Sequence, residues 1–218
     1  MGLQNTVSRE KWLAARKSLL AREKAFNKKR DELSAMRRDM PFVQIEDEYV
    51  FQTEDGEQTL LELFGSHKQL IIYHFMYGPD WEEGCPSCSL WADNFDGIDV
   101  HLAARNTAFA CVSNASLAKL LTYRKRLGWS FKWVSAETSS FSADFGVSFH
   151  QGDESKLGAG YNYSGKVFGK EMPGISVFTR GEDNTILHSY STYSRGLDML
   201  NGMYHFLDLT PLGRDEEK

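Results

Sequence analysis

The chain has 218 residues, 41% of them hydrophobic, and a formal net charge of −5, so it suffices for one domain with a buried core plus an appendage. The acidic balance argues against nucleic acid as a partner, since phosphate binding needs clustered positive charge. No run reaches the roughly 18 apolar residues of a membrane span, and the N-terminus lacks the apolar core of a secretion signal, so we expect no membrane partner and a cytoplasmic location.

The first predicted element is a long helix that begins after Ser8, a suitable N-cap, and ends near Met40, before Pro41. The stretch 9–39 is basic, with 11 Lys and Arg against 5 Asp and Glu. Its apolar stripe is too narrow for a strong coiled coil, because only every seventh position is filled, at Trp12, Leu19, Phe26, Leu33 and Met40. We expect residues 1–41 to form a helical extension that lies along its own domain or pairs two copies into a homodimer.

A second unit, residues 42–218, is predicted to begin with short strands. The segments 49–53 and 58–64 flank Asp55-Gly56, which is a hairpin signal. The run 69–76 has the length and composition of a strand buried in a sheet. Behind it comes one face of an amphipathic helix, formed by Trp91, Phe95, Ile98 and Leu102.

The next segments complete a βαβ pattern, in which parallel strands are joined by a right-handed crossover. Residues 107–112 form a strand, and a helix capped by Ser113 or Asn114 runs to Leu127 and stops at Gly128. A third strand is predicted over 131–134, followed by a short helix over 139–145.

The glycine-rich stretch 150–172 breaks the pattern, and a loop of that length in a compact domain is usually functional or mobile. Residues 175–179 and 185–190 then predict an antiparallel hairpin. Ser194 is placed as the cap of a last helix whose shared face consists of Leu197, Leu200, Tyr204 and Leu207.

The reactive chemistry lies at the junction of the buried strand and its helix, in Cys85-Pro86-Ser87-Cys88. A helix N-terminus presents free N–H groups and a partial positive charge, which stabilise a thiolate. Glu82 and Glu83 act in the opposite direction, because nearby carboxylates raise the pKa of a thiol. The direction of the net shift is therefore open at this point.

The element order, with the cysteine pair at the end of the first parallel strand, is the thioredoxin arrangement. It predicts an α/β, thioredoxin-like three-layer fold with a mixed central sheet, plus the long N-terminal helix. Thioredoxin-like domains place a cis-proline beside the redox pair, and Pro173 occupies the matching position before an apolar strand. Sequence does not fix the isomer of the Met172–Pro173 bond, since only about 5–6% of X–Pro bonds in folded proteins are cis.

From about residue 18 onward the chain is similar to a bacterial thioredoxin-like family classified as a domain of unknown function and loosely grouped with peroxiredoxins. The matching segments are DWEEGCPSCSLWADNFDG, RLGWSFKWVSA, DFGVSF, PGISVF and YSTYSRGLDMLNGMYHFLDLTPLGRDE. The resemblance implies the fold and a role for the two cysteines at Cys85 and Cys88. It implies no particular substrate.

A metal site is the first alternative, although one C-x-x-C supplies only two of the four ligands that zinc needs. His74, His101 and His150 are candidates for the remainder, and a copper site would use His150 or His188. No second ligand pair has a recognisable spacing, so we favour redox chemistry and expect no metal or other cofactor.

A peroxiredoxin mechanism is the second alternative, and it requires a Pro-x-x-x-Thr/Ser-x-x-Cys loop. Pro79 precedes Cys85 by six residues instead of seven, and Glu82 occupies the Thr/Ser position. Peroxidase activity of that type is therefore not predicted. Cys111, within an apolar strand, is interpreted as a buried inert thiol.

The leading hypothesis is a thioredoxin-like thiol–disulfide oxidoreductase that acts on a protein or small-molecule thiol or disulfide. Cys85 is the attacking thiolate and Cys88 the resolving thiol. Trp81 and Pro173 are placed in the substrate groove, although the core and groove roles of the tryptophans cannot be divided from sequence. The alternative from a different class is a redox-inactive binding or scaffold module.

Overall fold

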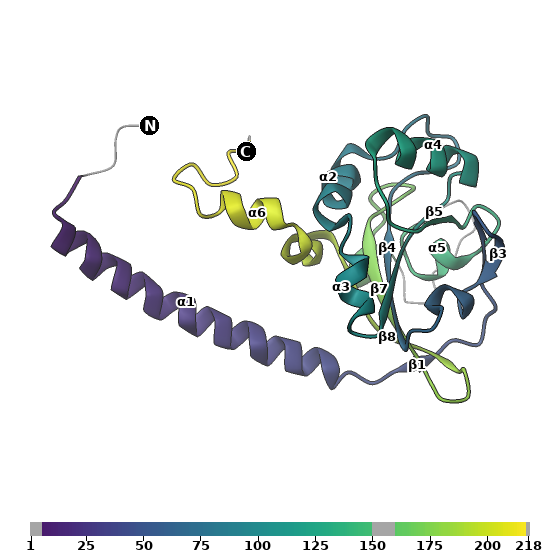
Figure 1. The fold of residues 1–218 in the computed structure, drawn as a ribbon, viewed down its shortest axis with the longest axis horizontal. Coiled ribbons are helices and arrows are strands. Elements are labelled where there is room, and N and C mark those ends of the chain that lie inside the picture. Colours follow the sequence, from purple (N-terminus) through teal and green to yellow (C-terminus); the bar gives the residue numbers. More distant parts are fainter. Residues whose placement is uncertain (1–5, 150–159, 217–218) are drawn as a thin grey trace. The chain divides into compact units, whose positions relative to one another are not determined.

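The computed structural model describes residues 6–149 and 160–216. The chain divides into two compact units, Met1–Pro41 and Phe42–Lys218 (Figure 1). The first unit is the helix α1 (Arg9–Arg38), in which the Ser8 hydroxyl accepts a hydrogen bond from the Lys11 N–H at 3.3 Å. The cap and the end before Pro41 are where the sequence predicts them.

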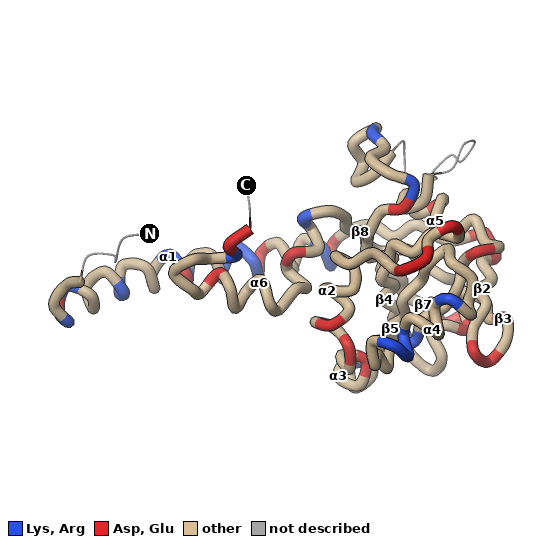
Figure 2. Tube along the Cα trace, turned by 90° about the horizontal axis from the view of Figure 1, so that it is seen from above, with Lys and Arg blue, Asp and Glu red and all other residues tan. Residues whose placement is uncertain are grey.

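The apolar positions of α1 that recur every seven residues are exposed, and Figure 2 shows basic residues at several points along the helix. No helix of the described residues is long and apolar enough to cross a membrane. Pairing of two copies through α1 stays a prediction.

The second unit is built on a mixed sheet with the strand order β1-β8-β7-β4-β5-β6-β2-β3. Strands β4, β5 and β6 are parallel, and every other neighbouring pair is antiparallel. In chain order the strands are β1 (Val43–Gln44), β2 (Val50–Thr53), β3 (Gly56–Thr59), β4 (Gln69–His74), β5 (Thr107–Ser113), β6 (Trp133–Ser135), β7 (Gly174–Arg180) and β8 (Ile186–Tyr193).

The helices lie on both sides of this sheet, with α2 and α3 on one side and α5 on the other (Figure 1). The α-helices of this unit are α2 (Pro86–Phe95), α3 (Asp99–Ala103), α4 (Leu117–Leu127), α5 (Phe141–Asp144) and α6 (Gly202–Leu207). The 3-10 helices among the described residues are η1 (Glu62–Phe64), η2 (Tyr161–Tyr163) and η3 (Ser194–Leu200).

Alternation along β4 divides the core into two clusters. Leu70 and Ile72 face one way, into a cluster with aromatic residues of β2, η1 and α5. Tyr73 faces the other way, into a cluster with α2, α4 and the tryptophans Trp129 and Trp133. The three-layer, thioredoxin-like α/β fold that the sequence predicts is confirmed.

The second strand of the first hairpin is shorter than predicted, because β3 ends at Thr59. The Thr59 N–H and hydroxyl donate to the Glu62 carboxylate at 2.7 and 2.9 Å, and the Glu62 N–H donates back to Thr59 Oγ at 3.3 Å. This reciprocal capping box starts η1 in place of a continued strand.

The helix after the cysteine pair is broken into α2 and α3 at Asp96 and Gly97. Gly97 has a φ of +79°, which glycine adopts readily. The Asp96 carboxylate accepts hydrogen bonds from the N–H and hydroxyl of Ser130 at 2.8 and 2.9 Å. This tie to the loop before β6 favours a break between α2 and α3 over a continuous helix.

Two other helices differ from the prediction. Helix α4 begins after Ser116, because β5 extends through Ser113 and the Ala115 N–H donates to the Tyr77 carbonyl. The last predicted helix is split into η3 and α6 at Asn201, whose side chain accepts a hydrogen bond from the Tyr204 N–H at 3.3 Å. Of the predicted loop 150–172, residues 150–159 lie outside the described residues.

A buried chain of four hydrogen-bonded side chains crosses β4, β7 and β8. His74 Nε2 lies 2.8 Å from Ser176 Oγ, which lies 2.9 Å from Ser191 Oγ, and His188 Nε2 closes the chain at 2.8 Å. Burial, and then the charge of His188, lower the pKa of His74 to about 3. His74 therefore stays neutral in the folded protein at pH values where an unfolded histidine takes up a proton.

We expect acid to destabilise the fold through His74. The unfolded chain binds this proton below about pH 6.5, and the folded chain does so only near pH 3. The contribution of neutral His74 to the free energy of unfolding is therefore fully present above the unfolded pKa and falls as the pH drops from about 6.5 to about 3. In a His74→Gln variant the free energy of unfolding should fall less steeply as the pH drops. The difference from the unaltered protein should be up to about 1.4 kcal/mol per pH unit across this window, measured by urea unfolding.

The control for this experiment is His101→Gln, which removes an exposed histidine of α3. It should keep the slope of the unaltered protein. Equal slopes for His74→Gln and the unaltered protein would show that His74 does not cause the acid sensitivity.

Candidate functional site

The cysteine pair lies where β4 gives way to α2. Cys85 is the N-cap of α2 and Pro86 its first residue, where a missing N–H donor costs nothing. The Cys85 N–H donates to the Met76 carbonyl at 3.0 Å, and the Ser89 N–H donates to the Cys85 carbonyl at 2.9 Å. The site is thus tied to the end of the central strand.

The two thiols have different surroundings. Cys85 is partly exposed, whereas Cys88, one turn into the helix, is 2% exposed and packs in the core. Both thiols are free. This arrangement gives the pair one outward-facing sulfur and one covered sulfur.

The pKa of Cys85 is lowered to about 6. A hydrogen bond from the Cys88 thiol is the largest cause, and the N–H groups of Cys88 and Ser87 with the Ser87 hydroxyl add to it. Burial acts in the opposite direction but is outweighed. The net direction that the sequence leaves open is therefore downward, and Cys85 is mostly thiolate at neutral pH.

Cys88 shows the opposite effect. The bond to Cys85 and burial raise the pKa of Cys88 well above its usual range. Cys111 is fully buried in β5, and burial likewise raises its pKa. Of the three thiols, Cys85 alone combines exposure with a low pKa.

One of the two carboxylates upstream of Cys85 is compensated by a positive charge. Glu83 forms an ion pair with Arg126 of α4 at 2.6 Å, so its charge is compensated. Lys119, also on α4, donates to the carbonyls of Pro79 and Trp81 at 2.7 and 3.1 Å. The loop before the cysteines is therefore fastened to α4.

A cavity of about 210 Å³ opens beside Cys88. Its walls are mainly apolar, and Arg195 and Asp198 supply its charged residues. The apolar contributors come from β4, the loop after it, α2, the residue before β7 and η3, namely Tyr73, Met76, Trp91, Pro173 and Leu197. Because about 150 Å³ can hold a benzene ring, this cavity has room for one side-chain-sized group.

The cavity brings together some of the residues singled out from the sequence. Pro173 and Cys88 line it, but Trp81 does not, and Trp91 does. Trp129 and Trp133 are buried in the core. The helical face that predicts α2 includes Trp91, but periodicity does not show which apolar residue of a helix meets a cavity. A groove role for Trp81 stays a prediction.

Pro173 is held by its neighbours on both sides. The Met172–Pro173 bond is trans, unlike the cis-proline of thioredoxin-like domains. The Tyr161 hydroxyl donates to the Pro173 carbonyl at 2.7 Å. Two residues before Pro173, the carboxylate of the buried Glu171 accepts hydrogen bonds from two side chains. The shorter of its two contacts with the Asn114 amide is 3.0 Å, and its contact with the Ser148 hydroxyl is 3.1 Å. Nothing in the sequence pattern singles out Glu171.

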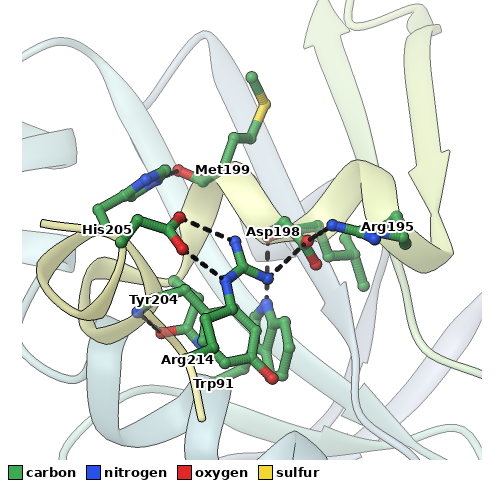
Figure 3. A network of polar contacts seen from close by, with 10 residues as sticks. Trp91, Arg195, Asp198, Met199, Tyr204, His205 and Arg214 are labelled. Atoms are coloured by element: carbon green, nitrogen blue, oxygen red, sulfur yellow. Dashed lines mark hydrogen bonds and ion pairs between the residues drawn. The ribbon is translucent and has the colours of Figure 1, made fainter. Parts of the chain in front are cut away.

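The C-terminal segment, residues 194–216, lines the cavity through Ser194, Arg195, Leu197 and Asp198. Figure 3 shows the polar contacts that hold this segment. Trp91 Nε1 donates to the Leu197 carbonyl at 3.1 Å, and the Tyr204 ring meets the Trp91 ring edge to face at 5.4 Å between centroids. Arg214 stacks over Tyr204 at 4.0 Å. This stack attaches the segment to α2.

Arg214 also holds the segment together internally. It makes two hydrogen bonds to the Asp208 carboxylate and one to Asp198, all at 3.1 Å. Arg195 reaches the same Asp198 oxygen at 3.0 Å, but its side chain is 84% exposed against 21% for Arg214. Exposed ion pairs contribute little, so we assign the main role to Arg214.

The histidines considered as metal ligands are not gathered around the cysteines. His74 and His188 belong to the buried chain on the opposite face of β4, and His101 is exposed on α3. His150 lies outside the described residues. Within residues 6–149 and 160–216, no group of three or more His, Cys, Asp or Glu is arranged to hold a metal.

We expect the alkylation rate of Cys85 to rise with a midpoint near pH 6, followed by mass spectrometry of its peptide. Cys88→Ala should move the midpoint upward, because it removes the largest cause of the low pKa. Cys88→Ser should move it less, since a hydroxyl can still donate. Cys111→Ala serves as the control and should leave it unchanged. An unchanged midpoint in Cys88→Ala would contradict the assignment of the Cys88 thiol as the main cause of the low Cys85 pKa.

The role of Arg214 can be tested by limited proteolysis of residues 194–216. Arg214→Gln should increase the cleavage rate severalfold, because the segment loses three hydrogen bonds and its stack on Tyr204. Arg195→Gln is the matched control, since it removes an exposed contact to the same carboxylate. Equal cleavage of both variants would count against a clamp at Arg214.

Among solved structures, the chain resembles peroxidoxin BcpB of Mycobacterium tuberculosis, with a TM-score of 0.50 and 13% identity over 74% of this chain and 93% of that one. Peroxiredoxin Q of Xanthomonas campestris has a TM-score of 0.45 and 15% identity over 71% and 87% of the two chains. A thioredoxin-like protein of Porphyromonas gingivalis has a TM-score of 0.44 and 13% identity over 69% and 82%. At these identities the likeness concerns the fold alone.

Among curated proteins none matches the chain. The family model described as a bacterial protein of unknown function, DUF899, matches residues 1–218. The peroxiredoxins among the similar structures share the fold that the expected thioredoxin-like family has. The expected family is confirmed, because the chain belongs to the bacterial family of unknown function DUF899.

Proposed function

We propose that the protein is a thiol–disulfide oxidoreductase that works through Cys85 and Cys88. The observation that carries the proposal is the contact between a partly exposed thiol of lowered pKa and a buried thiol one helical turn away. This contact lets one sulfur react with a substrate and the other complete the reaction. No metal or bound cofactor takes part in the proposed chemistry.

The reaction begins when the Cys85 thiolate attacks one sulfur of a substrate disulfide. A mixed disulfide forms with Cys85, and the other half of the substrate leaves as a thiolate. Cys88 then loses its proton and attacks Cys85 Sγ, which closes the Cys85–Cys88 bond and releases the second half. The substrate gains two electrons and the cysteine pair loses them.

The surroundings of the pair support a substrate that is a protein or a small molecule containing a thiol or disulfide. Pro173 and the apolar cavity beside Cys88 offer room for one group next to the reacting sulfurs. We retain Trp81 as a groove residue on the loop before Cys85, outside that cavity. A reducing compartment such as the cytoplasm would keep the pair ready to react.

A redox titration against reduced and oxidised dithiothreitol tests the proposal, with thiols counted by mass after alkylation. We expect an intramolecular Cys85–Cys88 disulfide that Cys111→Ser retains and that Cys85→Ser and Cys88→Ser abolish. The unaltered protein should also reduce insulin disulfides. A pair that stays reduced at every accessible potential would leave a thioredoxin-fold binding module as the better description.

A further inference from the structure

The Tyr161 hydroxyl bonds to two segments of the chain that meet at the cavity beside Cys88. It donates to the Pro173 carbonyl at 2.7 Å and accepts a hydrogen bond from the Ser194 N–H, also at 2.7 Å. Pro173 lies directly before β7 and Ser194 begins η3, and both residues line the cavity. Tyr161 does not line the cavity itself. A side chain outside the cavity therefore joins two of its walls.

The surroundings of Tyr161 hold its hydroxyl in place. Its side chain is buried, and its ring meets the rings of Tyr193 and Phe168 edge to face, with centroids 5.5 and 6.3 Å away. Its N–H donates to the Lys166 carbonyl at 2.7 Å. Gly160, directly before it, has a φ of +80°, and a Cβ there would lie 2.4 Å from the Lys166 nitrogen. The bridging hydroxyl thus belongs to a turn with no room for rearrangement.

Ser194 marks the point where β8 gives way to the cavity wall in η3. Its φ is +51°, a left-handed conformation that is uncommon for residues other than glycine. Such a conformation persists only where its surroundings hold it. The Tyr161 hydroxyl takes the N–H of this residue. The bridge therefore helps to fix the start of η3, and with it Leu197, which lines the cavity from the same helix.

The cavity suits one aromatic ring of a substrate, by its size and its mainly apolar walls. Ser87 and Cys88 line it, and they lie in the first turn of α2, which begins after Cys85. A group that enters the cavity therefore belongs to the part of a substrate that is close to the exchanged disulfide.

The charges at the cavity favour an acidic group next to that ring. The Asp198 carboxylate is partly buried and accepts hydrogen bonds from Arg195 at 3.0 Å and Arg214 at 3.1 Å, so its charge is compensated (Figure 3). The Arg195 side chain is exposed. A substrate carboxylate at this edge therefore meets a positive charge.

We propose that Tyr161 is a positioning residue that determines specificity, because its bridge sets the width of a subsite for an aromatic residue beside the cysteine of an acidic peptide disulfide. The carboxylate of this substrate lies toward Arg195. The inference rests on the proposed thiol–disulfide chemistry and names the class of substrate. Tyr161 acts through Pro173 and Ser194, so it should affect which disulfide binds and not the exchange of electrons between the sulfurs.

Two symmetrical disulfides test the subsite, those of N-acetylcysteinylphenylalanine and N-acetylcysteinylglycine, which carry the same charge. Oxidation of the reduced protein is followed by quenched alkylation and mass, and each rate is divided by that of the same disulfide with dithiothreitol. The phenylalanine disulfide should react about tenfold faster, mainly through a lower half-saturating concentration, because its ring leaves water. Equal rates would overturn the subsite and leave the oxidoreductase standing.

Tyr161→Phe removes the bridge and keeps the ring. The preference for the phenylalanine disulfide should fall to about two- to threefold, since the two walls lose both hydrogen bonds, while the rate with the glycine disulfide stays the same. A general loosening of the fold would slow both reactions alike. Tyr163→Phe is the matched control, because this tyrosine of the same turn donates to the Ser191 carbonyl at 3.5 Å, and neither residue lines the cavity. It should keep the full preference.

A second variant keeps the test decisive if Tyr161→Phe does not fold. Replacement of Tyr161 by 4-aminophenylalanine keeps a donor for the Pro173 carbonyl but accepts poorly from the Ser194 N–H, so the preference should fall below that of the unaltered protein. An unchanged preference in both variants, or in whichever one folds, would overturn the role of Tyr161. Failure of the unaltered protein to reduce either disulfide would overturn the proposed function and this inference together.

The contact with Arg195 has its own test. The phenylalanine disulfide with amidated carboxyl groups should react about two- to threefold more slowly than the acid, as expected for an exposed ion pair. Arg195→Gln should remove this difference and retain the preference for phenylalanine over glycine. Equal rates for acid and amide in the unaltered protein would overturn the acidic class of substrate.

Discussion

The backbone of Met76 joins the central strand to the start of the helix that carries both cysteines. Its carbonyl accepts a hydrogen bond from the N–H of Cys85, the N-cap of α2, at 3.0 Å. The residue follows β4, which is hydrogen bonded along its length to β5 and β7. The position of α2 is therefore fixed by the central sheet, and both cysteines lie in its first turn.

One contact gives the two thiols opposite properties. The hydrogen bond between them lowers the pKa of Cys85 and raises that of Cys88, so one sulfur is ready as a nucleophile while the other keeps its proton. The cluster of Tyr73 and Phe95 behind Cys88, and the C-terminal segment fastened by Arg214, keep water away from the protonated partner. Burial and helix position would thus act together to order the two steps of the proposed reaction.

Much of this could be predicted from the sequence, because hydrophobic periodicity fixes β4, α2 and the strand order around them. Hydrophobic periodicity does not show the contacts that polar side chains make through hydrogen bonds. The break at Asp96 depends on Ser130, 34 residues away, and the clamp of Arg214 on Tyr204 depends on tertiary placement. The direction of the Cys85 pKa shift could not be assigned, because it depends on hydrogen bonds from Cys88 and Ser87 that outweigh burial, and the spacing of the residues does not give that balance. Trp91 lies on the predicted helix face, but periodicity does not show that Trp91 and not Trp81 lines the cavity.

The three thiols differ in how a reagent in solution can reach them, and Cys111 is the most deeply buried. Cys85 meets the solvent directly, Cys88 is reached through its neighbour, and Cys111 sits between β4 and β6 with no exposed surface. A reagent can reach Cys111 only when the packing over this face of the sheet opens, since its side chain lies in the buried cluster that includes α2. Oxidants would therefore react with Cys85 and Cys88 first, and modification of Cys111 would indicate that the fold had been lost.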